Sequence, residues 1–104
     1  MMNTIDYYND LLIVGGTTQD SNLNSIASTG SPMPAVALYN LKTATTDEYV
    51  WFKSYSINQG ANQMQHMMFN PEGTLIYTYI QGDTSQYFLL INTTTGIATS
   101  LYEL

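Results

Sequence analysis

The spacing of turn-forming residues constrains the fold of this chain more than any other feature. Gly, Asn, Asp and Pro interrupt the sequence at intervals of about eight to twelve residues, and Thr, Tyr, Ile and Val dominate the segments between them. β-branched and aromatic residues favour extended backbone, and helical periodicity is poor almost everywhere. The pattern predicts an all-β protein made of short antiparallel strands.

The predicted strands are bounded by these turns. Asn70-Pro71-Glu72-Gly73 is typical of a β-turn with Pro at its second position, and Thr93–Gly96 is expected to form the last hairpin turn. A polar loop is predicted from Gln19 to Pro34, and Pro32 and Pro34 should lie outside the sheet interior because proline lacks an amide donor. The strands expected around these turns cover residues 11–17, 35–40, 48–55, 64–69, 74–80, 86–92 and 97–101.

One segment allows two interpretations. Met64, Met67 and Met68 follow the i, i+3, i+4 spacing of a helix. The flanking residues are loop-like and the segment is short, which favours a strand. A regular strand places Met64, His66 and Met68 on one face.

Composition excludes several partners. The 104 residues fit one domain. Lys42 and Lys53 are the only basic residues besides the histidine, and with eight carboxylates they give a net charge of −6. Nucleic acids and anionic membranes are bound largely through Lys and Arg, so neither is an expected partner. Charged residues make up only 10% of the chain, so the sheet edges lack the usual charged protection against pairing with another chain. Self-association is therefore expected.

The chain contains no cysteine, which excludes disulfides and thiolate metal sites. No segment approaches the roughly 20 apolar residues that span a bilayer, and Leu11–Val14 is too short for the core of a signal peptide. A soluble mature protein, or a fragment of a longer one, is expected. The neutral polar composition is common in secreted and assembly-forming β proteins and favours an extracellular location.

Two parts of the sequence resemble each other. The segment 11–16 aligns with 75–80, and the apolar strand ending at Asn40 aligns with the one ending at Asn92. In each part a Thr-containing turn then leads to a strand that ends near Ser54-Tyr55 or at Ser100-Leu101-Tyr102. The chain is predicted to hold two units within one domain, covering 1–56 and 57–104, each about as long as the roughly 40–50 residues of a propeller blade.

The motifs in these units resemble the β-propeller repeat family. They are the apolar strand running into Gly-Gly-Thr at 12–17, the strand ending in Asn at 35–40, and Trp-x-Lys-x-Tyr at 51–55. The segment 67–77 resembles the turn that joins the two inner strands of a blade. The second unit departs from the pattern at Gln81-Gly82 and at 98–102. The resemblance implies two four-stranded antiparallel, propeller-blade-like units; a β-sandwich is the alternative. Propellers close with about four to eight blades, so further blades or further copies are implied.

The sequence offers few routes to catalysis. His66 is the only histidine, and no nucleophile motif accompanies it. Asp47 and Glu48 are adjacent, and neighbours in a strand point to opposite faces, so they cannot act together as acid and base. Asp83 follows Gly82 in an expected turn, where a hydrogen bond to the backbone explains it. No catalytic residue and no cofactor is predicted.

The one candidate metal site lies in the 19–34 loop. Asp20, Asn22 and Asn24 have the alternating spacing of oxygen ligands in a calcium loop. Ser25 and Ser31 stand where that loop needs a glycine and a bidentate acid. A solvated polar loop is the favoured interpretation, and no metal is predicted.

Asn92-Thr93-Thr94 is a glycosylation sequon in an expected surface turn, so Asn92 is the candidate acceptor. Most of the aromatic residues are expected to pack within the sheets. The candidates for an interface are Tyr7, Tyr8, Trp51, Tyr55 and Tyr102.

The leading functional hypothesis is a non-catalytic structural or protein-interaction module within a larger propeller or a homomeric assembly. Its partner is then a protein, either further blades or another copy. The alternative is a carbohydrate- or ligand-binding module that uses the 19–34 loop and exposed tyrosines. An enzyme completed by further blades is a third hypothesis.

Overall fold

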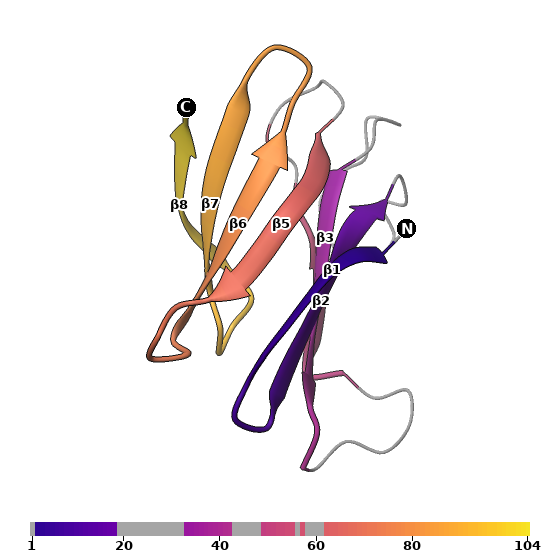
Figure 1. Ribbon diagram of the computed structural model, residues 1–104, viewed down its shortest axis with the longest axis vertical. Helices are drawn as coiled ribbons and strands as arrows, with labels where there is room; N and C mark the ends of the chain where they lie inside the picture. Colours follow the sequence, from indigo (N-terminus) through magenta and orange to yellow (C-terminus); the bar gives the residue numbers. More distant parts are fainter. Residues whose placement is uncertain (1, 19–32, 43–48, 56, 58–61) are drawn as a thin grey trace.

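The computed structural model describes residues 2–18, 33–42, 49–55, 57 and 62–104, and there it contains strands and no helix (Figure 1). The prediction of an all-β protein is confirmed. The strands are β1 (Met2–Tyr8), β2 (Leu11–Thr18), β3 (Met33–Asn40), β4 (Trp51–Ser54), β5 (Gln63–Phe69), β6 (Leu75–Gln81), β7 (Gln86–Asn92) and β8 (Ala98–Glu103).

The strands form two four-stranded antiparallel sheets in the order β1-β2-β3-β4 and β5-β6-β7-β8 (Figure 1). Every strand within a sheet pairs with the next one along the chain, as is common where antiparallel strands follow one another. The sheets pack against each other, and β5 lies against β1, β2 and β3. The predicted fold class, two four-stranded antiparallel units, is confirmed.

The strand β1 is the one that the sequence pattern does not predict. Thr4 and Asp6 point toward the second sheet, and Thr4 is buried, whereas Ile5 and Tyr7 alternate with them and are exposed. A search for an apolar face directed at the core therefore misses this strand.

The two sheets repeat the same irregularity. A β-bulge interrupts the pairing of β1 with β2 between Met2 and Thr4. A bulge at the corresponding place interrupts the pairing of β5 with β6, between Met64 and His66. Bulges are specific features of a sheet rather than random defects, so their coincidence supports a structural repeat.

The strand registers repeat as well. Leu11 pairs with Asn40 in the first sheet, and Leu75 pairs with Asn92 in the second. Leu11 therefore corresponds to Leu75, as the sequence alignment predicts, and Asn40 corresponds to Asn92.

The last strand of each sheet ends on an equivalent hydrogen bond. The Tyr55 amide donates to the Pro34 carbonyl at 2.8 Å, and the Leu104 amide donates to the Gln86 carbonyl at 2.7 Å. Tyr55 thus corresponds to Leu104. The sequence alignment, which matches the ends of these strands at Tyr55 and Tyr102, is two residues out of register.

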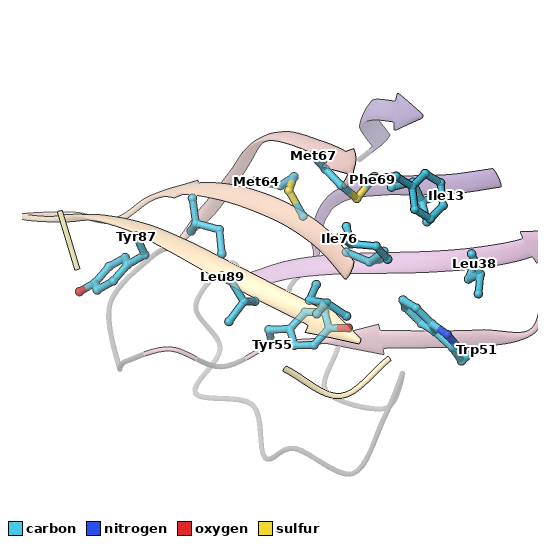
Figure 2. Packing of buried hydrophobic residues seen from close by; sticks show 13 residues of the cluster. Ile13, Leu38, Trp51, Tyr55, Met64, Met67, Phe69, Ile76, Tyr87 and Leu89 are labelled. Atoms are coloured by element: carbon cyan, nitrogen blue, oxygen red, sulfur yellow. The ribbon is translucent and has the colours of Figure 1, made fainter. Parts of the chain in front are cut away.

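The hydrophobic core lies between the two sheets (Figure 2). The first sheet contributes side chains from β2, β3 and β4 and from the residue that follows β4, and the second contributes side chains from β5, β6 and β7. The buried cluster consists of Ile13, Val36, Leu38, Trp51, Tyr55, Met64, Met67, Phe69, Ile76, Ile80, Tyr87, Leu89 and Ile91.

The methionine segment forms a strand, as predicted, but its faces differ from the prediction. The bulge between Met64 and His66 adds one residue and shifts the alternation. Met64 and Met67 are buried, whereas His66 and Met68 are exposed. The expectation that Met64, His66 and Met68 share a face is wrong because a period of two does not continue across a bulge.

Pro34 also lies elsewhere than predicted. It is the second residue of β3, an interior strand, and it pairs with Thr17. Its carbonyl accepts the hydrogen bond from Tyr55. Proline is tolerated here because it stands at the start of the strand, where a missing amide donor interrupts the ladder least.

Asn70 organises the turn between β5 and β6. Its side-chain Oδ1 accepts hydrogen bonds from the amides of Thr74 at 2.8 Å and Leu75 at 3.1 Å, and its Nδ2 donates to Thr74 Oγ1 at 3.0 Å. Gly73 in this turn has a φ of 73°, and a Cβ there would clash with the Tyr8 ring. The turn is thereby packed against the first sheet.

Candidate interaction surface

The two sheets contact each other in part through side chains of the first sheet that bind backbone amides of the second. Asp6 Oδ2 accepts a hydrogen bond from the Phe69 amide at 2.8 Å, and Thr17 Oγ1 accepts one from the Met64 amide at 3.1 Å. Both amides belong to β5, an edge strand of the second sheet. Side chains of the first sheet thus cover part of an edge that could otherwise pair with another strand.

Trp51 and Tyr55 join the first sheet to the turn between β7 and β8. The indole Nε1 of Trp51 donates to the Thr93 carbonyl at 2.8 Å, and the Tyr55 hydroxyl donates to the Gly96 carbonyl at 2.7 Å. Gly96 has a φ of 75°, and a Cβ there would lie 2.6 Å from Trp51 Cδ2. The turn can approach the indole ring because this residue is glycine.

Burial raises the pKa of the Tyr55 hydroxyl above its ordinary value. The phenolate would lose hydration and could not donate to the Gly96 carbonyl. Tyr55 is therefore a neutral hydrogen-bond donor over the ordinary pH range.

The outward side of the second sheet is rich in apolar and aromatic side chains. Within β6 and β7 they alternate with the buried core residues, so they point away from the first sheet. The rings of Tyr77 and Phe88 pack with centroids 5.7 Å apart, and Met68 and Tyr102 are exposed. We define the second-sheet outer face as Met68, Leu75, Tyr77, Tyr79, Phe88, Leu90 and Tyr102.

The outward side of the first sheet carries exposed apolar side chains along β1, while its outward β3 positions Ala35 and Ala37 are buried. Ile5 is 60% exposed and Tyr7 is 72% exposed. An edge-to-face contact joins Tyr49 to Phe52, with ring centroids 5.6 Å apart, and another joins Tyr49 to Tyr39 at 6.4 Å. We define the first-sheet outer face as Ile5, Tyr7, Leu12, Val14, Tyr39 and Phe52.

The composition of these two faces is suited to burying apolar surface. Neither contains an Asp, Glu, Lys or Arg. His66 is exposed and pairs across the strands with Tyr79. Within the described part of the chain, no group of three or more His, Cys, Asp or Glu residues could hold a metal ion.

The predicted interface residues do not form one site. Tyr7 belongs to the first-sheet outer face and Tyr102 to the second-sheet outer face. Tyr8 is half-buried between the sheets, with its ring centroid 6.0 Å from that of Phe69. Trp51 and Tyr55 are buried in the contact between the sheets.

The predicted acceptor Asn92 is half-buried at the end of β7. Its Oδ1 accepts hydrogen bonds from the amides of Thr94 at 2.9 Å and Thr95 at 3.1 Å, which close the turn.

The candidate calcium ligands Asp20, Asn22 and Asn24, and the adjacent acids Asp47 and Glu48, lie outside the described residues. Asp83 is exposed in the turn between β6 and β7.

Sequence reasoning missed Tyr77, Phe88 and Leu90 as surface candidates. A signal for them is present in β6 and β7, where apolar residues occupy both the inward and the outward positions. Strands with two apolar faces are typical of sheets that are covered on both sides. In this chain only one side of the second sheet packs on the first.

Among the described residues, no helix is long and apolar enough to cross a membrane. Comparison with protein-family models, curated proteins and solved structures finds no match to this chain.

Proposed function

We propose that this chain is a non-catalytic β-repeat module that acts through protein–protein contact, as part of a larger propeller-like array or a homomeric assembly. The second-sheet outer face is the observation that carries this proposal. It places seven large apolar or aromatic side chains on an uncharged surface. Contiguous apolar patches on a protein surface commonly mark interaction sites.

The alternation of buried residues supports the same role. In β6, Ile76, Thr78 and Ile80 face the first sheet, while Leu75, Tyr77 and Tyr79 face outward. Repeat proteins have this property because each unit buries its apolar faces against its neighbours. A sheet of this composition is therefore expected to have a neighbour on each side.

Sedimentation velocity over a concentration series tests the proposal. We expect the chain to associate as its concentration rises, and we expect Tyr77→Asp to weaken that association. Thr84→Asp is the matched control. Thr84 is exposed in the turn between β6 and β7, so this substitution adds the same charge outside the second-sheet outer face. Circular dichroism verifies that both variants are folded. A chain that stays monomeric at every concentration contradicts the proposal.

A further inference from the structure

We propose that the second-sheet outer face is covered by the first-sheet outer face of a second copy of this chain. The two copies would pack head to tail, in the way that the two sheets already pack within one chain. This inference rests on the proposed interaction role and names the partner for it.

The strand registers show which positions of the two sheets correspond. Ile13 of the first sheet has the same place as Tyr77 of the second, because each stands two residues after the paired Leu11 or Leu75. Ile13 points into the contact between the sheets, whereas Tyr77 points outward.

The third strands show the same correspondence. Leu38 and Leu90 each stand two residues before the paired Asn40 or Asn92. Leu38 is buried in the core, while Leu90 points outward. The second-sheet outer face therefore occupies the positions by which the first sheet contacts the second.

The complementary surface is also present in the chain. Leu12 corresponds to Ile76 and Tyr7 to Phe69, since Tyr7 pairs with Leu12 and Phe69 pairs with Ile76. Ile76 and Phe69 are core residues, whereas Tyr7 is exposed and Leu12 is half-buried on the outward side. The first-sheet outer face thus occupies the positions by which the second sheet contacts the first.

One copy therefore carries both surfaces of the contact. The first-sheet outer face lies on one side of its pair of sheets, and the second-sheet outer face lies on the other. A contact of this kind between copies is heterologous, and it continues until it closes a ring or forms a filament. Neither face carries a charged strand residue that would oppose the approach. A propeller closes with about four to eight sheets, and each copy supplies a pair of sheets, so closure would take about two to four copies.

The register also predicts a specific neighbour pair between copies. Within the chain, the Asp6 carboxylate accepts from the Phe69 amide at 2.8 Å. Met68 corresponds to Asp6, because they pair with Tyr77 and Ile13 respectively. The Met68 side chain of one copy is thus placed beside the Tyr7 amide of the next.

Cross-linking of single-cysteine variants tests the arrangement. The chain has no cysteine of its own, so Tyr7→Cys and Met68→Cys each introduce a single thiol. A short bismaleimide is added to each variant alone and to their equal mixture. We expect cross-linked dimers chiefly in the mixture. Thr84→Cys, mixed with either variant, is the control for random collision.

The outcomes separate this inference from the proposed function. Two outcomes would refute the head-to-tail contact while leaving the interaction role in place, provided that the unmodified chain associates. In the first, either variant cross-links to itself as well as it does in the mixture. In the second, the mixture cross-links no better than the Thr84→Cys control. If the unmodified chain stays monomeric in sedimentation velocity, both are wrong.

A pair of substitutions to aspartate gives a second, independent readout. Met68→Asp places a carboxylate where Asp6 stands in the internal contact, so association should persist at about the unmodified strength. Tyr77→Asp buries a carboxylate without such a donor, and it should weaken association by about tenfold or more. Equal weakening by both substitutions would overturn the predicted register.

Discussion

The indole nitrogen of Trp51 donates a hydrogen bond to the backbone carbonyl of Thr93, 42 residues further along the chain, at 2.8 Å. The bond joins the last strand of the first sheet to the last turn of the second. Trp51 is only 8% exposed, so water replaces a lost donor poorly at this position.

Replacing Trp51 with Phe should therefore destabilise the fold. The variant keeps an aromatic ring but leaves the Thr93 carbonyl without this donor, and we expect a loss of about 1–3 kcal/mol in the free energy of unfolding. Urea denaturation followed by circular dichroism measures the change. Phe52→Leu is the matched control, because Phe52 is half-buried on the opposite side of the same strand. Equal effects of the two substitutions would refute the role of the hydrogen bond.

Tyr55 should make stability fall at alkaline pH. Its pKa is raised in the folded chain by burial, whereas the unfolded value is about 10. The folded chain then holds a proton that the unfolded chain releases. The stabilising contribution is complete below about pH 10 and is lost as the pH rises from there toward the folded value, by about 1.4 kcal/mol per pH unit.

Urea denaturation from about pH 8 to about pH 11 measures this loss, with Tyr55→Phe as the reference. The variant lacks the ionisable hydroxyl, so its stability should depend less on pH above about pH 10, although it is less stable near neutrality because the Gly96 carbonyl loses its donor. Parallel curves for the two proteins would show that Tyr55 is not the group responsible.

Thr78→Val should stabilise the chain. The Thr78 hydroxyl is buried, and in the described part of the chain it has no hydrogen-bond partner. Valine has nearly the same shape without the desolvated hydroxyl, and the corresponding position of the first sheet already holds Val14. We expect a gain of about 1 kcal/mol in the free energy of unfolding.

The contrasting substitution is Thr17→Val, because Thr17 Oγ1 accepts from the Met64 amide at 3.1 Å. This change should cost about 0.5–1.5 kcal/mol. Thermal and urea denaturation of both variants measure the change in the free energy of unfolding that each substitution causes. A gain from both substitutions would mean that valine is favoured for its strand propensity alone.

Asn70→Ala should weaken the turn between β5 and β6. The side chain makes three hydrogen bonds to Thr74 and Leu75, and Asn70 is only 6% exposed. We expect a loss of about 2–3 kcal/mol, since each bond contributes about 1 kcal/mol. Asn40→Ala is the control, because Asn40 Oδ1 accepts one exposed bond from the Lys42 amide at 3.0 Å. A smaller loss at position 70 than at position 40 would contradict this account.

The repeat is where sequence and structure agree most closely. The pairings that end at Asn40 and Asn92 confirm the alignment of Leu11 with Leu75. The alignment succeeds here because both units place a leucine at the start of the second strand and an asparagine at the end of the third. The register of the last strands was missed by two residues because the loop between β3 and β4 is longer than the turn between β7 and β8.

The faces of the strands were harder to predict. A bulge between Met64 and His66 reversed the expected orientation of Met68, and β1 buries Thr4 and directs Asp6 inward while exposing Ile5 and Tyr7. For β5 the period of two does not continue across the bulge, and for β1 the inward Asp6 carboxylate accepts a hydrogen bond from the Phe69 amide of β5.

The sequence by itself determined the all-β class, most of the strands and the turns that join them, because these depend on local propensity and on the short-range chemistry of Gly, Asn and Pro. Only the tertiary structure decided which aromatic residues are buried and which are exposed. Trp51 and Tyr55 look no different from Tyr7 and Tyr102 in the sequence. Their burial follows from the packing of one sheet on the turn of the other, a contact between residues about 40 positions apart.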